Sequence, residues 1–287
     1  MHWQTTRHRI ALDQPLVMGI VNATPDSFSD GGLHADAPSA QAHCERLVRE
    51  GAHILDIGGE STRPGARTPD LAEELARVLP VLRHAVTLGV PVSVDTSRPE
   101  VMQAALDLGV DIINDVRSLA QPGALTVVAA HPACGVCLMH MNGEPGVMQQ
   151  DPRYDGDVVD SVVQWLHDRR AAVLAAGVAA ERITLDPGIG FGKTAAHNWA
   201  LLRRQHDLLA LGQPLLVGWS RKSTLGQLTG RPVEGRLPAS LAAALAAVQR
   251  GARVLRVHDV AATVDALQVW AAAGLPETTS RQGQDKP

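Results

Sequence analysis

Short apolar runs alternate with longer helical patterns along nearly the whole chain. The runs are rich in β-branched and aliphatic residues and mostly lack polar–apolar alternation, which is typical of strands buried on both faces. Because such strands alternate with helices, the pattern predicts βαβ units and a parallel sheet. The runs are Leu16–Val21, Ile54–Ile57, Val92–Val94, Ile112–Ile113, Val136–Met139, Ile183–Leu185, Leu215–Val217 and Val254–Val257.

The segments between these runs have the periodicity of amphipathic helices, with an apolar stripe turned toward the sheet. One stripe consists of Leu71, Leu75, Val78, Leu79 and Leu82, and another of Val158, Val162 and Leu166. Strands and helices in this number predict an α/β fold, a single-domain (β/α)8 or TIM barrel, which takes about 250 residues. No linker divides the chain, so we expect one domain over residues 1–275. Within it, residues 1–15 form an N-terminal extension that closes the bottom of the barrel, and residues 276–287 are a disordered polar tail.

Composition and charge exclude several classes of function. The 287 residues include 26 Lys and Arg against 30 Asp and Glu, for a net charge of -4. Nucleic-acid and membrane partners are not expected, because both need clustered basic residues. The first residues lack an apolar signal region, and no run approaches the roughly 20 residues of a membrane helix, so we expect a cytoplasmic protein.

The cysteines do not indicate a disulfide framework, since three cannot all pair within one chain. Cys134 and Cys137 have the spacing of a redox pair or of half a zinc site. Only one such pair exists, and Cys137 lies in a predicted buried strand. We therefore expect a structural role for both.

Polar residues or glycines follow the predicted strands, and in a barrel these positions meet at the C-terminal face, where active sites lie. Ser97–Glu100 reads as a helix capping box, and Asp259 reads as a cap of the last helix. Caps do not explain Asp95, Asn114 and Asp186, which stand at the strand ends themselves. We expect these three side chains to point into the barrel mouth and to be functional.

Three of the loops after the strands are unusually rich. The loop Asn22–Gly32 is long and contains glycine, as a mobile lid does, and Gly58–Gly65 places a guanidinium beside two hydroxyls. The loop Asp186–Thr194 resembles two nucleotide motifs and fits neither. A P-loop needs glycine where Pro187 stands, and a dinucleotide fingerprint needs glycine where Lys193 stands. Its glycines would let backbone approach a flat ligand.

At the last strand tip, Arg256 and His258 place two potential cations on alternate residues, which indicates an anion site. Together, these motifs resemble the dihydropteroate synthase family from about Leu16 to Ala272. Two departures, Ala23 and Trp219, replace other apolar residues and affect no polar contact. The motifs stand in family order as Asn22–Gly32, Gly58–Gly65, Ser93–Ser97, Ile113–Ser118, Leu138–Met141, Leu185–Lys193, Gly218–Ser223 and Arg256–Asp259.

The resemblance implies condensation of (7,8-dihydropterin-6-yl)methyl diphosphate with 4-aminobenzoate, giving 7,8-dihydropteroate and pyrophosphate. It also implies Mg2+ as cofactor and a homodimer. Pyrophosphate would depart and the neutral arylamine would attack, so no enzyme nucleophile is needed, and none is evident in the sequence. Cations at the departing phosphate oxygens would stabilise charge that grows in the transition state.

The resemblance also assigns residues to the two substrates. Asp186 would accept the adjacent N–H donors of the pterin, and Arg256 would stack its guanidinium on the ring. The pterin diphosphate site would comprise Thr62, Asp95, Asn114, Met139, Asp186, Phe191, Gly218, Lys222, Arg256 and His258. The aminobenzoate site would comprise Phe28, Arg63, Pro64 and Ser223, the metal ligand would be Asn22, and the catalytic groups would be Asp95, Arg63, Lys222 and His258.

Two alternatives share part of this pattern. A pterin-binding methyltransferase barrel would keep the Asp and Asn cradle but has no use for a pyrophosphate site, so the motifs Ser61–Gly65 and Arg256–His258 favour the synthase. A non-catalytic pterin-binding homologue could keep Asp186 and Asn114 while losing the first two rich loops, whereas both of these are complete here.

Overall fold

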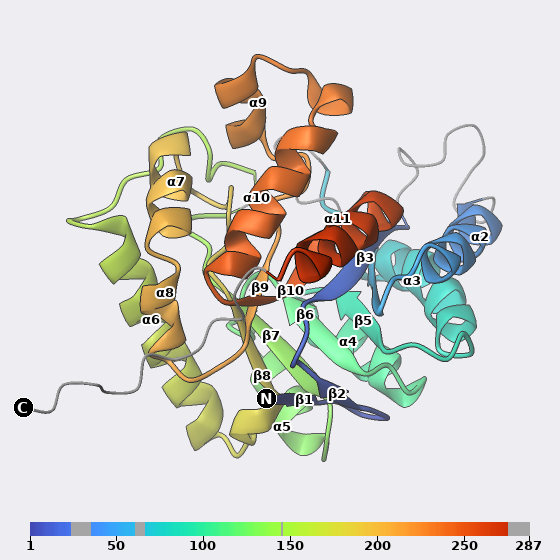
Figure 1. The fold of residues 1–287 in the computed structure, drawn as a ribbon. Coiled ribbons are helices and arrows are strands. Elements are labelled where there is room, and N and C mark those ends of the chain that lie inside the picture. The colour runs from blue at the N-terminus through green and yellow to red at the C-terminus, as the bar shows by residue number, and fades with distance from the viewer. Residues whose placement is uncertain (24–35, 61–66, 145, 275–287) are drawn as a thin grey trace, which may run out of the picture.

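Eight parallel strands close into a barrel in this computed structural model, which describes residues 1–23, 36–60, 67–144 and 146–274 (Figure 1). The TIM-barrel prediction is confirmed, and each strand contains one predicted run. The strands are β3 (Leu16–Asn22), β4 (Ile54–Gly58), β5 (Val92–Asp95), β6 (Ile112–Asp115), β7 (Gly135–Met139), β8 (Ile183–Asp186), β9 (Leu215–Val217) and β10 (Ala252–Val257). Their order is β10-β3-β4-β5-β6-β7-β8-β9, so β10 pairs with β3 to close the ring.

Helices surround the barrel on its outside (Figure 1). They are α2 (Asp36–Arg49), α3 (Leu71–Ala85), α4 (Pro99–Asp107), α5 (Ala124–Ala130), α6 (Val158–Ala175), α7 (Ala195–Arg203), α8 (His206–Leu209), α9 (Ser223–Thr229), α10 (Leu237–Gln249) and α11 (Val260–Ala272), with 3-10 turns η1 (Ala180–Arg182) and η2 (Val233–Gly235). The predicted stripes are the inner faces of α3 and α6, where Val78, Leu82, Val162 and Leu166 are fully buried. None of the described helices is both long and apolar enough to cross a bilayer.

One predicted helix cap is wrong, and the other stands at the predicted position without capping through its side chain. The N-cap of α4 is Arg98 and makes no side-chain cap bond, because the hydroxyl of Ser97 donates instead to the carboxylate of Asp115 on β6. Asp259 stands at the N-cap of α11, but its carboxylate accepts hydrogen bonds of 3.0 and 2.5 Å from the Arg221 guanidinium. In both cases the side chain binds a partner distant in the sequence, Asp115 or Arg221, and does not bind the helix backbone as the local sequence predicts.

The chain before the first barrel strand forms a hairpin at the end of the barrel where the strands begin. Strands β1 (His2–Gln4) and β2 (Arg9–Ala11) pair antiparallel, and β1 lies beside β8 and η1. Trp3 is fully buried in a cluster with Met18, Ile54 and Ile112, and its indole N–H donates to the Arg182 carbonyl at 2.9 Å. A Cβ at Gly135 would lie 2.9 Å from that indole nitrogen, so the strand approaches the ring closely.

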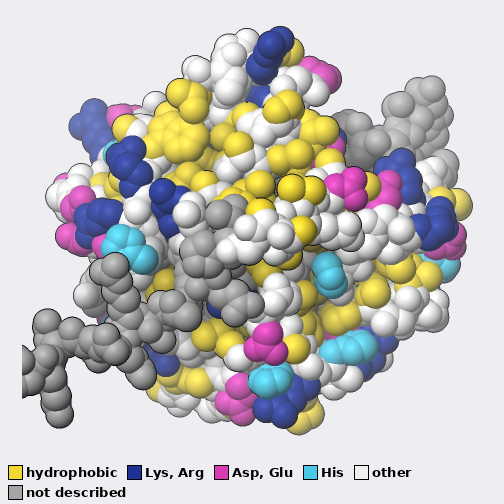
Figure 2. Space-filling model, in the orientation of Figure 1, with side chains coloured by type: hydrophobic (Ala, Val, Ile, Leu, Met, Phe, Trp, Pro, Cys, Tyr) yellow, Lys and Arg dark blue, Asp and Glu magenta, His cyan; other side chains and the backbone are white. Residues whose placement is uncertain are grey.

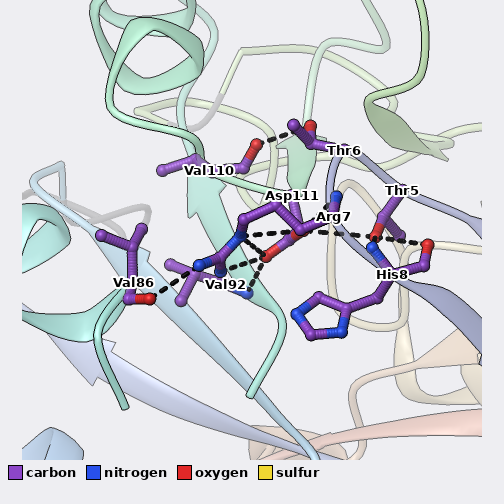
Figure 3. A network of polar contacts seen from close by, with 8 residues as sticks. All are labelled: Thr5, Thr6, Arg7, His8, Val86, Val92, Val110 and Asp111. Atoms are coloured by element: carbon purple, nitrogen blue, oxygen red, sulfur yellow. Dashed lines mark hydrogen bonds and ion pairs between the residues drawn. The ribbon is translucent and has the colours of Figure 1, made fainter. Parts of the chain in front are cut away.

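A buried carboxylate fastens this hairpin to the barrel (Figure 3). Asp111, directly before β6, is fully buried and accepts from the Arg7 guanidinium at 2.5 Å and from the Thr5 hydroxyl at 3.3 Å. It also accepts the Val92 amide N–H at 3.0 Å, and Arg7 reaches the Val86 carbonyl at 2.6 Å. Since the buried charge is paired and hydrogen-bonded, the desolvation cost of burying it is offset.

Candidate active site

The strand register brings polar side chains to one level at the C-terminal end of the barrel. Asp95, the last residue of β5, stands opposite Asn114 of β6. On the far side of the mouth, Met139 ends β7 opposite Asp186, which ends β8. Asn22 ends β3. The parallel strands therefore gather these residues around one opening.

Asp56 lies beneath this opening and is not among the predicted site residues. It is fully buried in β4, and its Oδ2 accepts from Nε of Arg256 at 2.6 Å and from Nδ2 of Asn114 at 3.1 Å. The sequence does contain a signal for it, because an Asp inside the apolar run Ile54–Ile57 needs a partner when buried. That run was interpreted as a buried strand only.

Arg256 joins two carboxylates at the floor of the site. Besides the bond to Asp56, its Nη2 donates to Asp95 at 2.7 Å. These in-plane bonds orient the flat guanidinium, as stacking on a ring would require. They also change one expectation, because Asp56 and Asp95 offset the positive charge that the sequence analysis assigned to an anion site shared with His258.

Burial dominates the ionisation of Asp95. It raises the pKa of this carboxyl above its ordinary value, while the Arg256 guanidinium opposes the shift and the neighbouring carboxylates Asp56, Asp115 and Glu60 add to it. A proton on Asp95 is thus easier to hold than on an exposed aspartate. Perturbed carboxyls of this kind concentrate at functional sites.

The second acceptor of the mouth is Asp186, whose Oδ1 accepts the Gly188 N–H at 2.7 Å. Burial raises the pKa of Asp186 to about 6, against that hydrogen bond and the nearby Lys222. Gly188 has a φ of 67°, and a Cβ there would overlap the His140 carbonyl oxygen. The absence of a side chain at Gly188 therefore lets the loop pack against the backbone of His140.

A cation and an aromatic ring form the wall beside Asp186. The ammonium of Lys222, the N-cap residue of α9, lies 4.4 Å from the centroid of the Phe191 ring. Burial lowers the pKa of Lys222 to about 8, Asp186 opposes this, and Arg256 adds to it. Ser223 is the first residue of α9. Gly218 faces open space, since a Cβ there would have no described atom within 4 Å apart from those of its chain neighbours.

His258 directly follows β10 and is held by Ser220. The Ser220 hydroxyl accepts the His258 amide N–H at 3.2 Å and lies 3.0 Å from Nδ1 of the ring. The Ser220 hydroxyl donates to Nδ1 when the ring proton is on Nε2, and it accepts from Nδ1 when the proton is there.

Four predicted site residues, Phe28, Thr62, Arg63 and Pro64, lie outside the described residues. Within the part of the chain that the structure describes, no group of three or more His, Cys, Asp or Glu side chains could hold a metal ion. Asn22, the predicted metal ligand, is the last residue of β3. All three cysteines, Cys44, Cys134 and Cys137, are buried and form no disulfide. Cys44 lies in α2 and Cys134 directly precedes β7, so neither belongs to the strand ends of the barrel mouth.

Comparison with known proteins gives one consistent result. Residues 18–258 match the family of pterin binding enzymes. The dihydropteroate synthase of Neisseria meningitidis serogroup C is 54% identical, over 95% of this chain and 98% of that protein. That of Escherichia coli K12 is 49% identical, over 90% of this chain and 91% of that protein.

Solved structures agree. Xanthomonas albilineans dihydropteroate synthase with 4-aminobenzoic acid is 50% identical, with a TM-score of 0.89 over 95% of this chain and 98% of that one. The Burkholderia cenocepacia dihydropteroate synthase complexed with 7,8-dihydropteroate is 48% identical, with a TM-score of 0.85 over 95% of this chain and 96% of that one. With its barrel, its polar mouth and these relatives, the chain belongs to the pterin-binding enzyme family, among the dihydropteroate synthases.

Proposed function

We propose that the protein joins (7,8-dihydropterin-6-yl)methyl diphosphate to 4-aminobenzoate, forming 7,8-dihydropteroate and pyrophosphate. The observation that carries this proposal is the pairing of a buried acceptor, Asp186, with a cationic donor, Lys222, at the barrel mouth. A pterin offers adjacent N–H donors on its pyrimidine edge and acceptors at its ring oxygen and nitrogen, so both groups find partners. The solved relatives with 4-aminobenzoic acid and 7,8-dihydropteroate support the same chemistry.

The pterin lies, in this proposal, on a floor built by Asp56 and Arg256. Asn114 donates one amide N–H to Asp56, which leaves its carbonyl oxygen to accept from the ring. Arg256 stacks on the ring, and its bonds to Asp56 and Asp95 keep it from turning. Met139, Phe191 and Gly218 supply the apolar walls and the space between them.

The leaving group is held by Thr62, Arg63 and His258. Cationic and N–H donors gain strength as charge grows on the departing oxygens, so they stabilise the transition state more than the bound substrate. His258 contributes its ring, whose Nδ1 lies 3.0 Å from the Ser220 hydroxyl. Lys222 adds positive charge on the same side.

Magnesium fits the donor set that this chain offers. Mg2+ prefers oxygen ligands and is commonly held by one or two protein groups together with substrate phosphates and water. The amide oxygen of Asn22 would hold it, with the diphosphate supplying further ligands. When bound, the ion offsets charge on the departing pyrophosphate.

The C–O bond between the pterin methylene carbon and the diphosphate breaks first. The pterin ring delocalises the resulting cation. Asp95, close to the ring and to Arg256, offsets part of that positive charge. The 4-aminobenzoate nitrogen, neutral at pH 7, then attacks the methylene carbon and loses a proton. Phe28, Arg63, Pro64 and Ser223 position the aminobenzoate for this step, and no covalent enzyme intermediate forms.

We further propose that the protein works as a homodimer in the cytoplasm, with residues 1–275 as its one domain. Apolar side chains gather on the face that carries α7, α10 and α11 (Figure 2). Leu228 of α9 and Val269 of α11 are large apolar side chains with 69% and 70% exposure, and covering such side chains would favour association. The three free cysteines suit a reducing compartment. Light scattering of the purified protein tests the dimer.

Calorimetric titration with the pterin diphosphate tests the proposed site. The wild-type chain binds it, and Asp186→Ala abolishes binding because the pterin edge loses its charged acceptor. Unchanged affinity in a folded Asp186→Ala protein would refute the assigned pterin cradle.

A further inference from the structure

Lys193 is a buried cation that the proposed chemistry does not use. Its side chain is only 3% exposed, and its ammonium lies 2.9 Å from Nδ1 of His140, 3.2 Å from the His140 carbonyl and 3.1 Å from the Phe191 carbonyl. An ammonium has three N–H donors and no acceptor. These three contacts therefore use its whole donor capacity.

The partner ring is suited to accept this bond. Burial lowers the pKa of His140 to about 3, and Lys193 adds to the shift, so the imidazole is neutral and Nδ1 can accept. The ring packs edge-on against Trp165, with centroids 5.2 Å apart. The His140 amide N–H donates to the Asp186 carbonyl at 2.9 Å, which joins the ends of β7 and β8. Lys193 thus binds the loop after β8 to a fixed support.

Lys193 shares the task of holding this loop with the Phe191 N–H, which donates to the Gly188 carbonyl at 3.1 Å, and with the Tyr154 hydroxyl, which donates to the Gly192 carbonyl at 3.1 Å. Gly188, Gly190 and Gly192 all have positive φ, and Gly192 also approaches backbone, since a Cβ there would overlap the Asn142 carbonyl oxygen. Chains so rich in glycine lose much entropy on ordering. Between these glycines stands Phe191, whose ring lies under the Lys222 ammonium. The carbonyl that Lys193 holds belongs to this same residue.

We propose that Lys193 is a positioning residue of the pterin site, which sets Phe191, and through it Lys222, at the place where the pterin ring binds. Three other titratable groups interact electrostatically with Lys193, namely Asp186, Lys222 and His197. Burial lowers the pKa of Lys193 to about 7, with Asp186 opposing and Lys222 adding to the shift. The inference rests on the proposed function, because it presumes that a pterin binds here.

A double-mutant cycle tests the inference, with affinity for the pterin diphosphate measured by calorimetry. Lys193→Met keeps the length of the side chain but removes the three donors, and we expect about a tenfold loss of affinity. In a Phe191→Ala background, the same change should cost much less, because the ring that Lys193 places is gone. The KM for 4-aminobenzoate should change little. Equal losses in the two backgrounds, or unchanged affinity in folded Lys193→Met, would overturn the inference.

Arg182 offers a matched control. It is also a buried cation bound to backbone carbonyls, those of Cys134 and Val128, at the opposite end of the barrel. Arg182→Met should lower the melting temperature and leave pterin affinity unchanged. If Lys193→Met does not fold, Lys193→Gln keeps two N–H donors without the charge and should show a smaller loss with the same dependence on Phe191. A wild-type chain that binds no pterin diphosphate would refute the proposed function itself.

Discussion

Asp56 and Arg256 form an ion pair at the floor of the site, with Nε of the guanidinium 2.6 Å from Oδ2 of the fully buried carboxylate. The pair has a counterpart at the other end of the barrel, where Asp111, equally buried, binds Arg7 at 2.5 Å. Asp56 lies within β4 and Asp111 directly precedes β6, and each carboxylate organises the segment beyond its end of the barrel. The upper pair orders the substrate floor, and the lower one orders the N-terminal hairpin.

Replacing Asp56 with Asn should weaken pterin binding. The change removes the negative charge that holds the Arg256 guanidinium, so the floor loses its ion pair. Removing one charge of a buried pair costs about 3 kcal/mol or more of free energy. We expect part of that cost to appear as a loss of about tenfold to hundredfold in affinity for the pterin diphosphate. Calorimetry measures it.

Asp111→Asn is the matched control for that variant. It should reduce the midpoint of chemical denaturation, because Arg7 and the hairpin lose their partner, but pterin affinity should stay at the wild-type value. Equal pterin affinity in Asp56→Asn and wild type would contradict the role given to the floor.

Arg63→Ala should lower turnover far more than pterin affinity. In the proposed function Arg63 contacts the leaving group and the aminobenzoate, and such contacts matter most when charge develops. Steady-state kcat and the calorimetric affinity for the pterin diphosphate separate the two effects. If both fall by the same factor, Arg63 is a simple binding residue.

Pterin binding should have an optimum between about pH 6 and pH 8. Asp186 must be ionised to accept, and burial raises its pKa to about 6, so affinity falls as pH drops through that value. Lys222 carries its positive charge only when protonated, and burial lowers its pKa to about 8, so affinity also falls as pH rises through that value. A 6-hydroxymethyl dihydropterin, which has no diphosphate to titrate, is the probe for calorimetry. Affinity that stays constant across this range would contradict the assignment.

Much of the barrel could be predicted from the sequence, because burial on both faces makes each strand a continuous apolar run. The same physics brings Asp95, Asn114 and Asp186 together, since parallel strands end at one face. Local sequence does not show which partner a side chain chooses. Ser97 and Asp259 have the local pattern of caps, yet Asp115 and Arg221 bind them, and neither contact is visible in the spacing of residues.

The same limit explains Asp56 and Lys193. Each is a charged residue whose partners come from distant segments, 200 residues away for Asp56 and Arg256 and 53 residues away for Lys193 and His140. The apolar run around Asp56 indicates burial but not the guanidinium that makes burial possible. Lys193 stands where a nucleotide motif would need glycine, and only the fold shows what its ammonium binds.

The most direct test of the account is product analysis with the purified protein, the pterin diphosphate, 4-aminobenzoate and Mg2+. With both substrates we expect 7,8-dihydropteroate and pyrophosphate in equal amounts. In a separate reaction without 4-aminobenzoate we expect some pyrophosphate release, because bond breaking precedes attack. Pyrophosphate release that depends strictly on 4-aminobenzoate would count against the stepwise order. Absence of dihydropteroate under conditions where the pterin diphosphate binds would contradict the proposed function.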